Sequence, residues 1–192
     1  RAFLLTAAFV FLPVITPSAT SRIAKKSRAA QPAKTVAAPA LAQQWLARLS
    51  LRDRVAQLIT MPCYGENPNT RSKDFRKFRH WVQDLHIGGM IVLNRVVAGS
   101  ARNADPYAMA VFLNRMQRLS RLPLLISGDF ERGASMRVAN TTKFPHNMAY
   151  GAARAYEASR FEGAQTARES RALGVHWVFA PDADVNNNPD NP

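Results

Sequence analysis

Charged side chains gather directly after one apolar run of the sequence. The run Leu124–Gly128 leads into Asp129 and Glu131, and Arg137 follows eight residues after Asp129. An ionised aspartate can accept hydrogen bonds from two hydroxyls, and a guanidinium can donate to further hydroxyls or to an acetamido carbonyl. These residue types suit a sugar, whose hydroxyls each donate and accept. They suit equally well an Asp–Arg ion pair that fixes a loop, so both interpretations stay open at this point.

Apolar patterns around this stretch predict alternating helices and strands. Helical spacing of apolar residues predicts helices over residues 41–58 (with a cap at Ser50), 73–85, 105–119 and 153–173. Continuous apolar runs predict strands over residues 57–62, 86–94, 124–126 and 175–180. The second of these strands is entered through Gly88 and Gly89.

Strands of this kind, joined by helices, indicate an α/β fold with a parallel sheet and crossover helices. A doubly wound sheet and a (β/α)₈ barrel both fit the pattern. Both folds build their sites at the carboxyl ends of strands, where Asn94, Asp129 and Asp182–Asp184 lie. No Gly-x-Gly-x-x-Gly follows a predicted strand, which disfavours dinucleotide binding.

Five blocks, in order, resemble the N-terminal barrel domain of glycoside hydrolase family 3. The blocks are Asp53–Ile59, Gly88–Leu93, Asp129–Arg137, Thr142–Pro145 with Gly151-Ala152, and Phe179–Asn186. The resemblance covers about residues 45 to 192. It implies the first half of a (β/α)₈ TIM-type barrel, about four β/α units, within residues 41–192.

The resemblance also implies roles for individual residues. The family aspartate that matches Asp129 binds hydroxyls of the sugar, and the arginine that matches Arg137 lines the same pocket. Glu131 is expected to structure the loop, and Asp184 to support the pocket through a hydrogen bond at a strand end. Phe130 and the residue at 132 replace the family's usual Gln and Gly, so we expect a differently shaped loop.

The family's reacting groups have no match in this sequence. The resemblance implies retaining enzymes with an Asp nucleophile near the seventh strand, and an Asp–His pair after the fifth strand in the N-acetylglucosaminidase branch. Retaining hydrolysis needs one group that attacks and one that protonates the leaving oxygen. No catalytic residue is therefore assigned within the 192 residues. We expect this chain to be a C-terminally truncated part of a longer enzyme, and to be inactive alone.

The resemblance implies that the complete protein is a retaining glycosidase, with a glycan substrate. The first expectation is a β-N-acetylhexosaminidase acting on cell-wall or chitin fragments. A β-glucosidase of the same family and a non-catalytic glycan-binding remnant stay open as alternatives. A basic surface for polyanions is a fourth possibility, whose binding would weaken as salt rises.

The first 40 residues differ from the rest in composition. Residues 1–19 have a basic start, an apolar run and a small-residue exit, which predicts a signal peptide or an N-terminal anchor and an exported, periplasmic or extracellular protein. Residues 20–40 read as a basic Ala/Pro-rich linker. Residues 1–40 carry six Lys or Arg and no acid, and the remainder carries 20 basic and 13 acidic residues. Most of those basic residues lie beside acids in amphipathic segments, so we expect no nucleic acid partner.

The single cysteine and the four histidines give no sign of a further reactive centre. Cys63 follows an apolar run without a paired histidine, which predicts a small buried residue. His146 is interpreted as a loop residue, His176 as a core histidine with satisfied hydrogen bonds, and His80 and His86 as flanking a helix end. No pair has metal-ligand spacing with a third ligand, so we predict neither a metal nor a cofactor.

Overall fold

The computed structural model describes residues 38–65, 69–183, 187, 188 and 190 of the 192-residue chain. The chain divides into two units, Arg1–Ala38 and Pro39–Pro192, and the fold described below is that of the second unit. The predicted signal peptide or anchor, nearly all of the predicted linker and Asp184 lie outside the described residues.

Helices and strands alternate along the chain. The helices are α1 (Ala38–Ala47), α2 (Leu51–Ala56), α3 (Lys73–Arg79), α4 (Pro106–Leu119), α5 (Asn147–Ala153) and α6 (Tyr156–Ala172), with a π-helical segment at His80–Asp84 and a 3₁₀ turn at Ala134–Met136. The strands are β1 (Thr60–Cys63), β2 (Gly89–Val92), β3 (Arg95–Val97), β4 (Ser100–Arg102), β5 (Leu125–Gly128) and β6 (Trp177–Val178).

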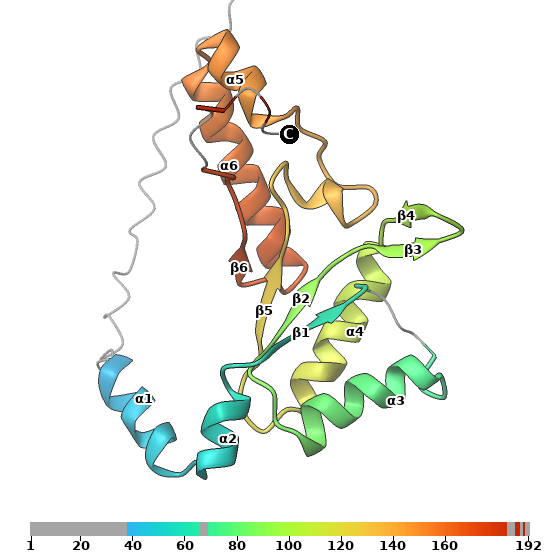
Figure 1. Ribbon diagram of the computed structural model, residues 1–192, viewed down its shortest axis with the longest axis vertical. Coiled ribbons are helices and arrows are strands. Elements are labelled where there is room, and N and C mark those ends of the chain that lie inside the picture. Colours follow the sequence, from blue (N-terminus) through green and yellow to red (C-terminus); the bar gives the residue numbers. More distant parts are fainter. Residues whose placement is uncertain (1–37, 66–68, 184–186, 189, 191–192) are drawn as a thin grey trace, which may run out of the picture. The chain divides into compact units, whose positions relative to one another are not determined.

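Four strands form one parallel sheet in the order β1–β2–β5–β6 (Figure 1). Each strand therefore lies next to the one that precedes it in the chain, apart from the separate β3–β4 hairpin. A doubly wound sheet reverses its strand order at a switch point, and this sheet does not. The topology favours the barrel type, here as an open sheet of four strands.

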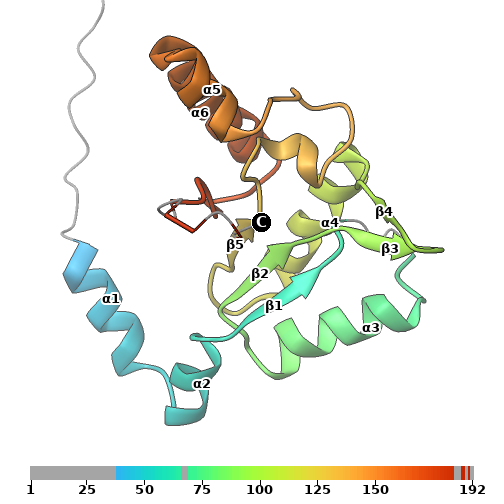
Figure 2. The ribbon, with the colours of Figure 1, turned by 45° about the horizontal axis from the view of Figure 1, so that its top comes forward.

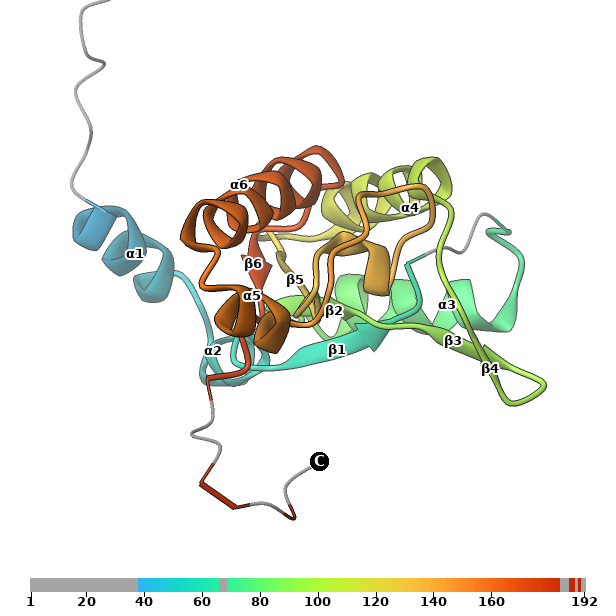
Figure 3. The same cartoon turned by 90° about the horizontal axis from the view of Figure 1, so that it is seen from above.

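The core lies between one face of the sheet and the helices. Met90, Val92 and Ile126 point into it and are fully buried. Phe78 of α3 and Phe112 of α4 meet them, with their ring centroids 5.3 Å apart in an edge-to-face arrangement. Figures 2 and 3 show α3 and α4 beside β1 and β2.

The opposite face of the sheet is exposed only in part, because Ser127 of β5 is buried whereas Leu125 of β5 and Trp177 of β6 are exposed. Leu125 and Trp177 are 45% and 53% exposed, although they alternate with buried Ile126 and half-buried Val178. A barrel wall carries helices on one face only, because its strands turn the other face inward. The burial pattern therefore agrees with the strand order.

The fourth strand is shorter than predicted, and His176 is not in the core. The pairing with β5 continues beyond Trp177–Val178 through hydrogen bonds from His176 N to Ile126 O (2.8 Å) and from Phe179 N to Gly128 O (2.9 Å). The imidazole Nδ1 of His176 accepts a hydrogen bond from Ile126 N (3.1 Å), so one ring nitrogen has the partner that was predicted. The residue is nevertheless exposed, because its ring pairs with the strand edge and does not pack inside.

The predicted helices differ from the observed ones mainly at their ends. The first helical stretch is two helices, and the Oγ of Ser50 accepts from Asp53 N (3.1 Å) to cap the second, as predicted. The helix predicted over residues 153–173 begins at Tyr156, and a separate helix, α5, ends at Arg154 in a left-handed conformation. The β3–β4 hairpin was not predicted. Its turn residues, Ala98 and Gly99, both have positive φ, which is typical of a tight two-residue hairpin turn.

Candidate functional site

Asp129 and Arg137 meet at the carboxyl end of β5. The guanidinium of Arg137 donates from Nη2 to Oδ2 of Asp129 and from Nε to the backbone carbonyl of Asp129 (3.1 Å). The two side chains are 27% and 21% exposed, so the ion pair is largely shielded from water. Arg137 therefore holds both the backbone and the carboxylate of Asp129.

A third contact ties Arg137 to the end of β2. Its Nη1 donates to Oδ1 of Asn94, whose Nδ2 donates to Oδ1 of Asn103 (2.9 Å). Nδ2 of Asn103 in turn donates to the carbonyl of Ser135 (2.7 Å). The strand ends at β2 and β5, the base of the hairpin and the loop after β5 thus share one hydrogen-bond network.

Backbone hydrogen bonds hold the same loop in place. Ala104 N donates to Arg137 O (2.8 Å), and Ala139 N donates to Ala104 O (2.8 Å). These bonds lie just beyond β4 and do not depend on side chains. The network around Arg137 consequently has a fixed backbone frame.

The geometry leaves part of the site available to a ligand. Oδ1 of Asp129 has no hydrogen-bond partner within the described part of the chain. The guanidinium of Arg137 also carries more N–H groups than its three contacts use. An acceptor beside fixed donors suits a hydroxylated ligand, and the paired charges also fix the loop, so the two interpretations of these residues are compatible.

Phe130 and Gly133 explain how the loop leaves the strand. Phe130 is fully buried, and a Cβ at Gly128 would lie 2.6 Å from its ring, so the strand must end in glycine for the ring to pack below it. Gly133 has φ 81°, and a Cβ there would lie 2.7 Å from the Phe144 ring. Arg132 keeps a backbone conformation outside the left-handed region.

Glu131 does not hold the loop through its side chain. It is exposed, and it makes no side-chain hydrogen bond or ion pair to any residue that the structure describes. The structuring contacts expected of Glu131 come from Arg137. Asp184 lies outside the described residues, and its expected role stays a prediction.

A cavity of about 560 Å³ lies between this loop, α5, α6 and the end of β6. Glu131, Tyr150, Glu162 and Asp182 are among the residues that line it. Neither Asp129 nor Arg137 does, so this cavity is separate from their network. The sugar-binding interpretation rests on the strand-end network alone.

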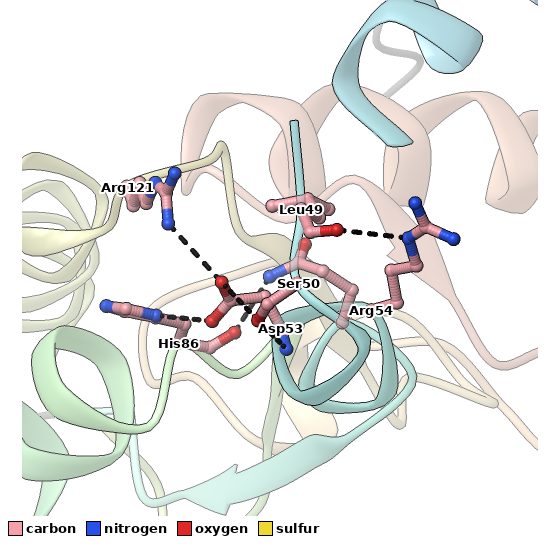
Figure 4. Close-up of polar contacts among 7 residues, drawn as sticks. Leu49, Ser50, Asp53, Arg54, His86 and Arg121 are labelled. Carbon is pink, nitrogen blue, oxygen red and sulfur yellow. Dashed lines mark hydrogen bonds and ion pairs between the residues drawn. The ribbon is translucent and has the colours of Figure 1, made fainter. Parts of the chain in front are cut away.

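A second polar cluster lies at the opposite end of the strands. Asp53 of α2 contacts Nδ1 of His86 (2.8 Å), accepts from Ser50 Oγ (2.9 Å) and faces Arg121 Nη1 (3.4 Å; Figure 4). The hydrogen bonds from His86 and Ser50 lower the pKa of the Asp53 carboxyl. His86 and Arg121 precede β2 and β5, at the amino-terminal ends where barrel residues serve stability.

This cluster has the contacts of a structural clasp. Gln57 Nε2 donates to the carbonyl of His86 (2.8 Å), and Gly88 N donates to Ala56 O (3.0 Å) and Ile59 O (3.1 Å). A Cβ at Gly88 would lie 1.9 Å from Gln57 O, so only glycine permits this approach. The clasp sets β2 against β1 and explains the glycine at the strand entry.

The remaining predicted residues are structural or exposed. Cys63 is fully buried, and burial raises the pKa of its thiol to about 12, which confirms a small core residue. His80 lies within a continuous helical segment and contacts Asp84 (2.7 Å), while His146 is exposed just before α5. Among the described residues, no group of three or more His, Cys, Asp or Glu could hold a metal ion, and no helix is long and apolar enough to cross a membrane.

The fold and the site define the class of protein. An open, barrel-type parallel sheet carries a polar network at its carboxyl edge, which is where barrel enzymes build their sites. Residues 50–192 match the N-terminal domain of glycosyl hydrolase family 3, and the chain belongs to this family. The predicted α/β barrel-type fold and the family resemblance are thereby confirmed.

The names of relatives in the family mention two kinds of activity, towards N-acetylated sugars and towards glucosides. The chain is 29% identical over 147 residues to a β-N-acetylglucosaminidase/β-glucosidase of Cellulomonas fimi, a match that covers 77% of this chain and 23% of that protein. It is 32% identical over 111 residues to β-hexosaminidase A of Pseudoalteromonas piscicida, covering 55% of this chain and 18% of that protein. The chain thus spans about a fifth of the length of these two relatives.

Solved structures share the fold. A β-glucoside phosphorylase, BglX, superposes with a TM-score of 0.65 at 24% identity, over 80% of this chain and 25% of that one. A β-N-acetylhexosaminidase from Beutenbergia cavernae superposes with a TM-score of 0.54 at 23% identity, over 70% of this chain and 38% of that one. These likenesses concern the fold alone.

Proposed function

We propose that this chain forms the sugar-recognition part of an exported retaining glycosidase that hydrolyses β-N-acetylhexosaminides. The observation that carries the proposal is the Asp129 carboxylate, which is oriented by Arg137 and keeps Oδ1 available at the carboxyl edge of the sheet. In this proposal Asp129 accepts from sugar hydroxyls, and Arg137 holds it in position. The attacking and protonating groups that retaining hydrolysis requires come from residues other than these two.

The N-acetylated sugar is favoured by the donors that surround the site. An acetamido group adds a carbonyl acceptor that glucose lacks, and the remaining N–H groups of Arg137 can donate to it. The names of two relatives that mention N-acetylglucosaminidase or hexosaminidase activity support the same choice. Export is proposed from the composition of residues 1–19.

A β-glucosidase of the same family is the second candidate. The Cellulomonas fimi relative is named for both activities, which is the observation that favours it. The two candidates differ in whether removal of the acetamido group weakens binding. A glycan-binding protein without turnover is distinguished from both by sugar affinity without hydrolysis in the full-length protein.

The experiment is a pair of sugar titrations on the purified chain. Chemical-shift changes are followed while N-acetylglucosamine or glucose is added. Tighter binding of N-acetylglucosamine supports the proposal. Tighter binding of glucose supports the β-glucosidase instead. Binding of neither sugar refutes the sugar-recognition role.

A further inference from the structure

Tyr64 lies in the same row of the sheet as Asp129. The register aligns Cys63 with Val92 and Val92 with Gly128 across β1, β2 and β5. Tyr64 and Asp129 each follow directly, with one strand between them. Neighbouring strands lie about 4.8 Å apart, so the two backbones are about 10 Å apart.

The two side chains also belong to the same face of the sheet. Cys63 is fully buried in the core, and a Cβ at Gly128 would point at the core ring of Phe130. Side chains alternate between the faces along a strand. Tyr64 and Asp129 directly follow the ends of β1 and β5, and continuing the alternation by one residue assigns both to the other face. Tyr64 is 37% exposed.

A clamp holds the Tyr64 ring. The guanidinium of Arg95 lies 5.1 Å from the ring centroid, and its Nη1 contacts Oδ2 of Asp74 at 3.2 Å. Arg95 directly follows Asn94, whose side chain accepts from Arg137. The consecutive residues Asn94 and Arg95 therefore link the tyrosine ring to the Asp129–Arg137 pair.

We propose that Tyr64 is a platform for a second sugar unit, next to the one held by Asp129, and that the site prefers a disaccharide to a monosaccharide. The inference rests on the proposed function and deepens it. The face of an aromatic ring is negative and attracts the positive C–H edges of a sugar ring. A span of two strands between Tyr64 and Asp129 exceeds one pyranose ring, and a linked pair of rings fills it.

The test compares two ligands on the full chain. N-acetylglucosamine and its β-1,4-linked disaccharide are titrated against the wild type and Tyr64→Ala by calorimetry. An aromatic contact of this kind is worth up to about tenfold in affinity, so Tyr64→Ala lowers disaccharide affinity about tenfold and leaves monosaccharide affinity unchanged. Unchanged monosaccharide binding also shows that the variant is folded.

Two further variants sharpen the result. Tyr64→Phe keeps the ring, and it retains the preference for the disaccharide. Tyr156→Ala removes another exposed tyrosine, at the start of α6, and changes neither affinity. The proposed role of Tyr64 is overturned if the wild type and Tyr64→Ala bind the disaccharide equally well. It is also overturned if Tyr64→Phe loses the preference for the disaccharide. Either result leaves the proposed function standing. Binding of neither ligand by the wild type overturns the proposed function itself.

Discussion

Replacement of Arg137 by methionine tests how the site is held together. The change keeps an unbranched apolar stem and removes the guanidinium. Three hydrogen bonds are lost, two to Asp129 and one to Asn94. The Asp129 carboxylate is 27% exposed, so water replaces only part of what it loses.

The size of the effect follows from these contacts. A hydrogen bond to a charged group contributes about 1.5 to 3 kcal/mol, and a neutral one about 1 kcal/mol. The contacts share one side chain and are not additive, and the backbone bonds between Ala104 and the loop remain. We therefore expect Arg137→Met to lower the free energy of unfolding by about 2 to 3 kcal/mol.

Urea unfolding followed by circular dichroism measures this difference. The matched control is Arg132→Met in the same loop, because the Arg132 side chain has no hydrogen-bond or ion-pair partner within the described chain. Its expected cost is within about 0.5 kcal/mol. Arg137→Lys should fall between the two, since an ammonium cannot reproduce the planar fork. Equal costs for Arg137→Met and Arg132→Met would refute the reasoning.

Three further changes probe other parts of the fold. Glu169 accepts from Thr142 N (3.1 Å), Thr142 Oγ1 (2.6 Å) and Gln165 Nε2 (3.0 Å), so Glu169→Ala should cost about 1 to 3 kcal/mol in urea unfolding, and no loss would show that α6 does not anchor this loop. Ala98 has φ 49° in the hairpin turn, where Asn is preferred, so Ala98→Asn should raise the melting temperature; a decrease would contradict the turn geometry. Partial burial, and then the charge of Arg171, lower the pKa of His176 below 6.5 in the folded state. The unfolded chain then binds more protons in acid, so stability falls as the pH drops below about 6.5. His176→Gln should flatten that part of the stability–pH curve, and an unchanged slope would contradict the assignment.

The sequence predicts the four sheet strands because each is an apolar run that enters the core. Val92 and Ile126 illustrate the reason, since full burial demands the residue types that reveal a strand. The β3–β4 hairpin carries no such signal. Val96 is 68% exposed, and three-residue strands are too short to show a period. The Ala98-Gly99 turn was its one visible sign.

The sequence predicted which residues form the site better than it predicted the hydrogen bonds between them. Asp129, Arg137 and Asn94 follow from residue type and position at strand ends. The bond between Arg137 and Asn94 joins residues 43 apart, and only the parallel pairing of β2 with β5 brings them together. Asn103 was missed because its place opposite Asn94 depends on the unpredicted hairpin.

The central claim is that the Asp129 carboxylate binds a sugar, and calorimetric titration of Asp129→Ala with N-acetylglucosamine tests it most directly. Asp129→Asn is measured beside it, because an amide oxygen can still accept from Arg137 and preserve the loop. Circular dichroism establishes that each variant is folded. Sugar binding that is lost in folded Asp129→Ala and weakened in Asp129→Asn is the predicted result. Wild-type affinity in both variants would contradict the claim. The Asp129–Arg137 ion pair would then serve only to fix the loop.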